Sequence, residues 1–461
     1  MVTIIAEKVN FADILCIVSH CMRIVKTLIL VFFLLPSAGL FSQERTLDVS
    51  TRHISDDSAL RMSLMDTWFT EPPRRTLDRK PELFRLSGGD QIEVRSEAGR
   101  DEVMVILARG RNGRYRGYIQ GSWILNRNLS DGRPNRIRIF LRSDPYTYIQ
   151  FRPLGDDRSQ MDMVLYEGMV IQSLPLAIPF QRLLVERTED VLKSLEEKFP
   201  RRYFDPPLDS YRDVRSLVAS VRKELPALSF VDDGAIDENG NYVFINTLLP
   251  QNSDSSPGGL NCSGFVKWLV DGLLKPVTGS RLAIPPLKEP AGDRGSAFTE
   301  PFEASRDPFF GLDWTRNLAL KAISVLRSPS YKTLHEIEVR DDKTATVIIR
   351  KEGQSSQRPY QGYLLNAGFG IEGLHSLLYT LAIDEPGCLY LAAVNAEMGR
   401  NPRIRQYFHV AALVPYFTEQ GAFQVAVFES AAETSFTAFK NRYPLHSVNL
   451  VRIPIEAAFD P

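Results

Sequence analysis

The sequence predicts an α+β protein with two folded parts, a small all-β sandwich or barrel at residues 81–178 and a mixed helix and strand domain at 179–461. Two observations support this division. Short runs of alternating apolar residues, separated by turn clusters, fill the stretch from about 82 to 175. Beyond this stretch, helical periodicity and strand-like runs are interspersed as far as residue 461.

The composition limits the class of protein. The chain has 461 residues, of which 44% are hydrophobic and 24% are charged, a balance typical of globular proteins with two or three domains. Lys and Arg number 55 against 56 for Asp and Glu, so the net charge is −1. We therefore expect no nucleic-acid partner, because no whole-chain field attracts one. One long apolar run, near the N-terminus, argues against a multi-pass membrane protein.

Residues 1–42 are interpreted as an upstream extension followed by a secretory signal peptide. Arg23 and Lys26 precede an apolar stretch at 27–35, and the small-residue segment PSAG follows at 36–39. This three-part order is typical of export signals. The alternative is an uncleaved membrane anchor, which the shortness of the apolar stretch disfavours. We expect export to the periplasm or cell envelope, processing near Ser42, no stable membrane span afterwards, and a polar linker at 43–80.

The β-rich domain at 81–178 is predicted from four alternating runs. They are EVMVIL at 102–107, YRGYIQ at 115–120, RIRIFL at 136–141 and YTYIQF at 146–151. Arginines and aromatic residues are interleaved along these runs. Such a face suits an anionic polymer or a glycan, but a solvated sheet face with ordinary aromatic residues produces the same pattern.

The mixed domain at 179–461 begins with helical patterns near 180–199 and 211–225. A turn signal at 237–241 (DENGN) precedes the strand-like run YVFIN at 242–246. Once residues 1–42 are removed, Cys262 and Cys388 are the cysteines that remain. Two cysteines are too few for a disulfide framework or a Cys-x-x-Cys zinc site, so we expect no metal and no cofactor.

Cys262 is predicted to lie in the first turn of a helix. Asn261, directly before it, is a preferred N-cap residue. Apolar residues then follow at helical spacing and define one buried face, namely Cys262, Phe265, Val266, Leu269, Val270 and Leu273. The unpaired N–H groups and the dipole of a helix start favour a thiolate, so this position suits a nucleophile. A small buried cysteine that only packs the helix start is the structural alternative.

Four segments, in this order, resemble the NlpC-type, papain-like cysteine peptidases of bacterial cell walls. They are YVFIN at 242–246, NCSGFV at 261–266, PGCLY at 386–390 and HVAAL at 409–413. The resemblance covers roughly 210–455 and implies a helix that bears Cys262 packed on an antiparallel sheet. It implies that Cys262 is the nucleophile and His409 the base, with Tyr242 and Ser263 on the substrate and oxyanion side. Peptidoglycan, or another peptide or glycan of the envelope, is the implied partner.

The chain also departs from the pattern of that family. The family's Trp-Gly-Gly after the upstream Tyr is missing here, which puts the substrate-side loop in doubt. Cys262 and His409 are separated by 409 − 262 = 147 positions, more than is usual in the family. We interpret residues 276–370 as an insertion that covers or reshapes the cleft, with a helix around 314–326 and a strand pair at 337–350.

His409 needs an orienting partner if it acts on a thiol. The strands expected at 409–417 and 423–430 flank the turn TEQG at 418–421. A hairpin centred at 419 pairs 411 with 427 and 409 with 429, which places Glu429 beside His409. A one-residue slip presents Ser430 or Phe428 instead. The other histidines of the mature chain, His53, His335, His375 and His446, are more typical of surface or structural positions, and His409 itself has a structural alternative.

These observations predict an exported cysteine hydrolase, an endopeptidase that cleaves peptidoglycan stem peptides through Cys262, His409 and Glu429. We expect Cys262 to remain reduced rather than bridged to Cys388. Two alternatives remain open. One is an inactive envelope-binding protein that keeps the same fold, and the other is a thiol-dependent amidase or acyltransferase.

Overall fold

The computed structural model describes residues 48, 50–54, 57–195, 199–251, 258–292, 307–326, 333–340, 346–349, 355–358, 363–364, 367–399, 404–456 and 458–461. The signal peptide and the extension expected at 1–42 lie outside these residues. Among the helices that the structure describes, none is long and apolar enough to cross a bilayer.

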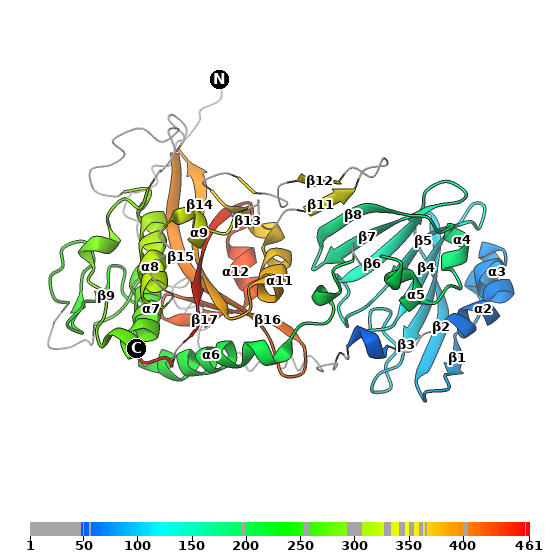
Figure 1. The fold of residues 1–461 in the computed structure, drawn as a ribbon, viewed down its shortest axis with the longest axis horizontal. Helices are drawn as coiled ribbons and strands as arrows, with labels where there is room; N and C mark the ends of the chain where they lie inside the picture. The colour runs from blue at the N-terminus through cyan, green and yellow to red at the C-terminus, as the bar shows by residue number, and fades with distance from the viewer. Residues whose placement is uncertain are drawn as a thin grey trace, which may run out of the picture. The chain divides into compact units, whose positions relative to one another are not determined.

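The first sheet is an antiparallel meander in which β1 to β8 follow one another in chain order (Figure 1). Its inward side chains alternate along the strands, for example Ile92, Val94, Val105 and Leu107, which are buried in one core. The strands are β1 (Glu82–Arg85), β2 (Gln91–Ala98), β3 (Glu102–Arg109), β4 (Trp123–Asn128), β5 (Pro134–Ile139), β6 (Tyr148–Pro153), β7 (Ser159–Leu165) and β8 (Gly168–Leu176). The strands expected at 81–178 are present. They form a single sheet in which the described β1 and β8 are not paired, rather than the expected sandwich or closed barrel.

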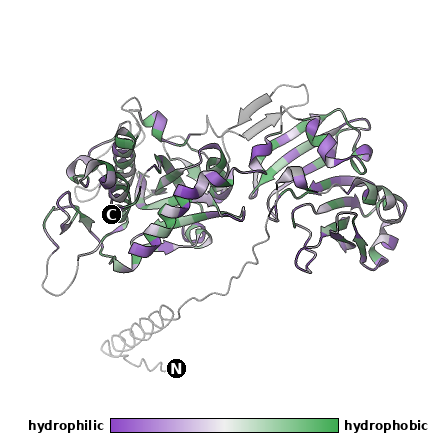
Figure 2. Ribbon diagram, turned by 60° about the horizontal axis from the view of Figure 1, so that its bottom comes forward, coloured by the Kyte–Doolittle hydropathy of each residue, from purple (hydrophilic) through white to green (hydrophobic). Residues whose placement is uncertain are grey.

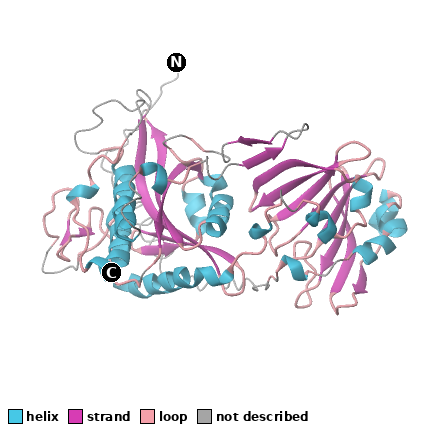
Figure 3. Cartoon of the chain, viewed as in Figure 1, coloured by secondary structure: helices cyan, strands magenta, loops and turns pink. Residues whose placement is uncertain are grey.

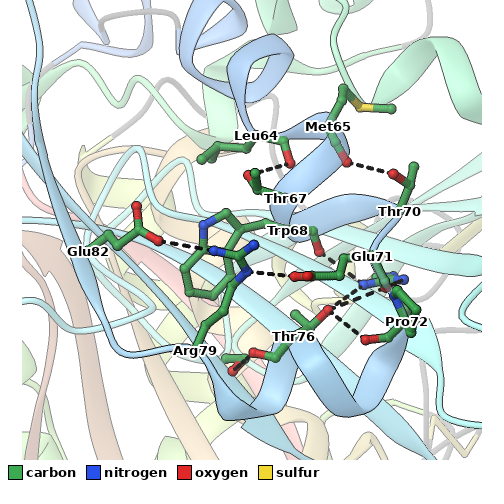
Figure 4. Close-up of polar contacts among 12 residues, drawn as sticks. Leu64, Met65, Thr67, Trp68, Thr70, Glu71, Pro72, Thr76, Arg79 and Glu82 are labelled. Carbon is green, nitrogen blue, oxygen red and sulfur yellow. Dashed lines mark hydrogen bonds and ion pairs between the residues drawn. The ribbon is translucent and has the colours of Figure 1, made fainter.

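The linker expected at 43–80 requires correction from residue 58 onward. This segment forms the helices α2 (Ser58–Ser63), η2 (Met65–Phe69) and α3 (Pro73–Asp78), after the short turn η1 (Thr51–His53). Trp68 and Phe69 are fully buried in the core of the meander. Figure 4 shows the Arg79 guanidinium over the Trp68 ring, 5.6 Å from its centroid, and bonded to Glu71 at 2.6 Å. The polar composition of residues 43–80 gave no indication that Trp68 and Phe69 are buried.

A buried arginine of the sheet holds this helical segment in place. Arg127 of β4 donates to the backbone oxygens of Trp68 at 3.0 Å, Glu71 at 2.5 Å and Gly132 at 3.0 Å. It also donates to the Thr76 hydroxyl at 3.0 Å. These acceptors compensate the desolvation of a cation that is 1% exposed. Residues 58–78 are therefore folded onto the meander and do not form a linker.

Short helices follow the meander. The helix expected at 180–199 is divided into α4 (Phe180–Leu183) and α5 (Thr188–Lys193), and η3 (Arg201–Tyr203) and η4 (Leu208–Tyr211) come next. The helix expected at 211–225 is confirmed as α6 (Arg212–Glu224), which η5 (Leu225–Ala227) extends. One side of α6 is buried, and its residues are Val214, Leu217, Val218 and Val221. Both hydrophilic and hydrophobic residues occur along the helix (Figure 2).

The second sheet has the strand order β13-β18-β14-β15-β16-β17 and is antiparallel throughout. Its strands are β13 (Phe369–Gly370), β14 (Cys388–Met398), β15 (Ile404–Phe417), β16 (Phe423–Glu429), β17 (Ala432–Thr434) and β18 (Ser447–Pro454). Side chains alternate between two cores along β15, since Val410, Ala412 and Val414 enter one core and Ala411 and Leu413 the other. Helices cover both faces, so the coarse α+β class is confirmed.

The helices α7 (Cys262–Thr278) and α8 (Phe310–Leu326) pack on one core and on each other, as Figure 3 shows beside the magenta strands. The helices α11 (Leu374–Asp384) and α12 (Phe436–Arg442) contribute to the other core. Small elements complete the domain, namely β9 (Ala235–Ile236), β10 (Tyr242–Val243), η6 (Pro285–Leu287), α9 (Leu334–Ile337) and η7 (Ile371–Gly373).

The segment expected as an insertion, 276–370, is in part a core element. Its helix α8, predicted around 314–326, packs against α7, β14, β15 and β18, and Trp314 is fully buried. The strand pair expected at 337–350 is wrong in its bounds. Ile337 ends the helix α9, and the strands are β11 (Thr346–Ile349) and β12 (Ser355–Arg358). β11 pairs with β8 in parallel, so this segment extends the first sheet.

Candidate active site

Asn261 fixes the start of α7 and with it the position of Cys262. The Asn261 side chain accepts a hydrogen bond from the Gly264 N–H at 2.8 Å, and its backbone is extended at φ −86° and ψ −172°. The N-cap prediction is therefore confirmed. Cys262 is the first helical residue and is partly exposed. The N–H groups of Cys262 and Ser263 have no partner within the helix, because first-turn donors lack intrahelical acceptors.

Two glycines let other backbone segments approach the helix start closely. A Cβ at Gly264 would overlap the carbonyl oxygen of Gly234, so only glycine permits this crossing of α7 and the segment before β9. A Cβ at Gly258 would overlap the side chain of Tyr242. The predicted substrate-side Tyr242 is thus packed against the chain four residues before Cys262.

A β-bulge precedes the histidine on β15. Val394 of β14 pairs with His409, but Asn395 pairs with Tyr407, so Phe408 is the extra residue. A bulge redirects the neighbouring side chains and is frequent beside functional sites. Phe408 and His409 are accordingly both intermediate in burial, although they are adjacent in a strand.

Cys262, His409 and Glu429 lie together, because α7 packs on β15 and β15 pairs with β16. The His409 ring and the Val410 backbone N–H both lower the pKa of the Cys262 thiol. His409 Nε2 donates to Glu429 Oε2 at 2.7 Å. Since Nε2 is bonded to the carboxylate, Nδ1 is the ring nitrogen that remains available for proton transfer. The structure thus brings together the three residues that the sequence suggested, from α7, β15 and β16.

The electrostatics of this chain favour a thiolate beside an imidazolium. Burial raises the pKa of the Cys262 thiol, but the hydrogen bond and charge of His409 outweigh it and leave that pKa below its ordinary value. Burial lowers the pKa of His409, and the hydrogen bonds and charges of Cys262 and Glu429 overcome this and raise it to about 9. Burial likewise opposes ionisation of Glu429, yet His409 and Arg442 hold its pKa below the usual range.

The hairpin that supplies His409 and Glu429 has a different register from the expected one. Leu413 pairs with Val427 and Ala412 with Phe428, so 411 rather than 409 lies level with 429. The shift of two positions preserves the face of every side chain, and Glu429 reaches His409 diagonally. The alternative with Ser430 does not occur, since Ser430 and Ala431 adopt positive φ values of 50° and 61° in the turn between β16 and β17.

The remaining histidines that the structure describes have other surroundings. Burial, followed by the charge of Lys440, lowers the pKa of His375 to about 4. The His375 ring packs among aromatic rings, with centroid distances of 4.2 Å to Tyr166 and 5.0 Å to Phe436. His446 is intermediate in burial, and its Nδ1 is bonded to the Pro444 oxygen at 2.8 Å. His53 lies in η1 and His335 in α9.

Ser263 lies beside Cys262, whereas Cys388 lies in a different core. Ser263 is buried, its hydroxyl lies 4.0 Å from the Cys262 sulfur, and its carbonyl accepts from Trp314 Nε1 at 2.9 Å. It therefore supports the helix start, and its side chain is not open to a substrate. Cys388 begins β14 in the core opposite to that of Cys262, and the two thiols are not bridged.

Sequence reasoning missed Arg442 and Tyr443. Arg442 Nη1 donates to Glu429 Oε1, the carboxylate oxygen that His409 does not use. The Tyr443 ring stacks on the His409 ring, with centroids 5.4 Å apart and planes inclined by 29°. The Ser435 N-cap of α12 was the available local signal, but nothing near it in the chain indicates which face of the site the helix reaches.

Among the described residues, no group of three or more His, Cys, Asp or Glu side chains is placed to hold a metal ion. In a comparison with known protein families, residues 50–203 match a family described as a domain of unknown function, DUF8515. The matched segment contains α2 to α3 and the whole meander. No match to the chain was found among curated proteins or among solved structures.

Proposed function

We propose that the chain is a cysteine hydrolase whose C-terminal domain is a divergent NlpC-type, papain-like peptidase. The observation that carries the proposal is Cys262 at the start of a helix that packs on β15, the strand whose His409 donates to Glu429 at 2.7 Å. A nucleophile, a base bonded to it and a group that orients the base are the components of covalent acyl transfer. Glu429 is buried and His409 is largely so, which strengthens their electrostatic interaction, while Cys262 is partly exposed.

The proposed reaction proceeds in two balanced steps. The Cys262 thiolate attacks the carbonyl carbon of an amide, and the His409 imidazolium donates its proton to the departing amine, leaving a thioester on Cys262. His409, now neutral, takes a proton from water, whose oxygen attacks the thioester and releases the acid and the thiol. The backbone N–H of Cys262, free of an intrahelical partner, would donate to the oxyanion of each tetrahedral intermediate.

Peptidoglycan stem peptides are the proposed substrate, and the periplasm or cell envelope is the proposed location. The substrate rests on the resemblance of the four segments around Tyr242, Cys262, Cys388 and His409 to the cell-wall peptidases. The location rests on the charged, apolar and small-residue order at 22–43. N-terminal sequencing of the protein from an envelope fraction tests the location, and a chain that retains residues 22–42 would indicate an anchor.

Thiol reactivity distinguishes an enzyme from an inactive binding protein. At neutral pH, iodoacetamide should alkylate Cys262 much faster than Cys388, because only a thiol with a lowered pKa is largely thiolate there. Cys388 is buried and Cys262 partly exposed, so Cys388 gives only a baseline rate, and the effect of the lowered pKa is measured by comparison with His409→Ala. His409→Ala should slow the alkylation of Cys262. Equal rates at both cysteines of the folded chain would contradict the proposed nucleophile.

Digestion of purified sacculi tests the substrate. The wild type should release peptide fragments, and Cys262→Ala and His409→Ala should release none, whereas Cys388→Ala should behave as wild type. An acyltransferase would be indicated by a different combination of results. In that case Cys262 is alkylated fast and no fragments are released, but the protein transfers the acyl group of a model thioester to an added amine. If His409→Ala retains hydrolysis, His375 and His446 become the histidines to replace.

A further inference from the structure

Both carboxylate oxygens of Glu429 are engaged in directed contacts. Oε2 accepts from His409 Nε2 at 2.7 Å, and Oε1 accepts from Arg442 Nη1. The Glu429 side chain is 4% exposed, so a lost partner would not be replaced by bulk water. Two donors on the two oxygens fix the rotation of the carboxylate plane as well as its position.

The helix α12 places Arg442 beside this carboxylate. Its N-cap residue Ser435 accepts from the Ala438 N–H at 3.1 Å, and Phe439 is fully buried in the core. These two anchors fix the last turn, where Arg442 ends the helix. The next residue, Tyr443, stacks on the His409 ring, and the Arg442 guanidinium lies 5.7 Å from the centroid of the Tyr443 ring.

We propose that Arg442 is a positioning residue of the candidate site, which holds the Glu429 carboxylate toward His409. This inference rests on the proposed function and adds a fourth member that acts only through Glu429. The Arg442 guanidinium contacts the Glu429 carboxylate and the Tyr443 ring. A glutamate on a strand can adopt several rotamers, and the second contact selects the one in which Oε2 faces the ring.

The charged and titratable groups around Glu429 determine the sign of the expected effect. His409 on β15, Arg442 on α12 and the neighbouring Tyr443 face it, and Cys262 lies beyond the imidazole. Without Arg442, Glu429 rotates more freely and binds a proton more readily. A neutral or displaced Glu429 stabilises the imidazolium less, so the thiolate of Cys262 should form only at higher pH.

The experiment measures the rate of Cys262 alkylation by iodoacetamide against pH, and needs no knowledge of the substrate. Arg442→Ala should slow alkylation at pH 6 by about tenfold, equivalent to ~1.4 kcal/mol, and move its onset to higher pH. Arg442→Lys, which retains the charge, should restore most of the rate. Arg222→Ala is the matched control, because Arg222 is also 47% exposed and bonded to a glutamate, Glu433. It should react as the wild type does.

A double-mutant cycle separates positioning from general destabilisation. In a Glu429→Gln background, Arg442→Ala should cause no further slowing, because the residue through which it acts is already altered. The Arg442 proposal is overturned if Arg442→Ala slows alkylation further in the Glu429→Gln background, or if alkylation of Arg442→Ala begins at the same pH as in the wild type. The proposed function still stands in either case, provided that Cys262 of the wild type is alkylated fast. If the wild-type Cys262 reacts no faster than Cys388, both the proposed function and this inference are overturned.

Discussion

Glu429→Gln tests whether the carboxylate sets the protonation of Cys262 and His409, the proposed catalytic pair. The substitution retains the size of the side chain and an acceptor oxygen for His409, but removes the negative charge. His409, whose side chain is 13% exposed, donates a hydrogen bond of 2.7 Å to the Glu429 carboxylate, which is 4% exposed. Hydrogen bonds to charged groups contribute about 1.5–3 kcal/mol. Because the amide retains a neutral hydrogen bond, we expect the lower end of this range.

A loss of ~1.5 kcal/mol corresponds to roughly a tenfold decrease in kcat/KM at neutral pH. The pKa of His409, which the native contacts raise to about 9, should fall, so the alkaline limb of the pH–rate profile should move to lower pH. Turnover against pH is the assay, and thermal unfolding verifies that the variant is folded. Glu433→Gln on β17, whose partner is Arg222, is the control and should keep the wild-type profile. An unchanged alkaline limb in Glu429→Gln would refute the assigned role of the carboxylate.

Three further predictions follow from the packing and from the ionised groups. Gly264→Ala should destabilise the fold by about 1–3 kcal/mol, because its Cβ meets a backbone oxygen that cannot move aside, and denaturant unfolding measures this. Arg127→Ala should lower the free energy of unfolding by about 3 kcal/mol or more, because it leaves buried acceptors unpaired. Arg133 is exposed, so Arg133→Ala should have little effect. Equal effects of the two substitutions would contradict the packing of residues 58–78 on the meander. The raised pKa of His409 stabilises the fold fully below the ordinary value of 6.5, so this contribution should disappear as pH rises through about 9. A pH series of unfolding midpoints for wild type and His409→Ala should converge there, and parallel curves would contradict the raised pKa.

The local features of the site were accessible from the sequence because they depend on neighbouring residues. The Asn261 cap and the apolar spacing along α7 follow from helix geometry alone, and both are present. The contact between His409 and Glu429 was expected from a hairpin whose register proved to be two positions off. It survives because the side chains of a strand alternate with a period of two, so an even shift keeps the face.

The sequence by itself determined the helix start at Cys262, the strand that carries His409 and the coarse α+β class, since these depend on capping and periodicity over a few residues. The tertiary structure alone decided that residues 58–78 are folded onto the meander, that α8 is part of the core, and that Arg442 reaches Glu429. The physical reason is the same in each case. These contacts join segments that lie apart in the chain, and the buried partner that satisfies a charge or fills a core is chosen by packing, which no local pattern encodes.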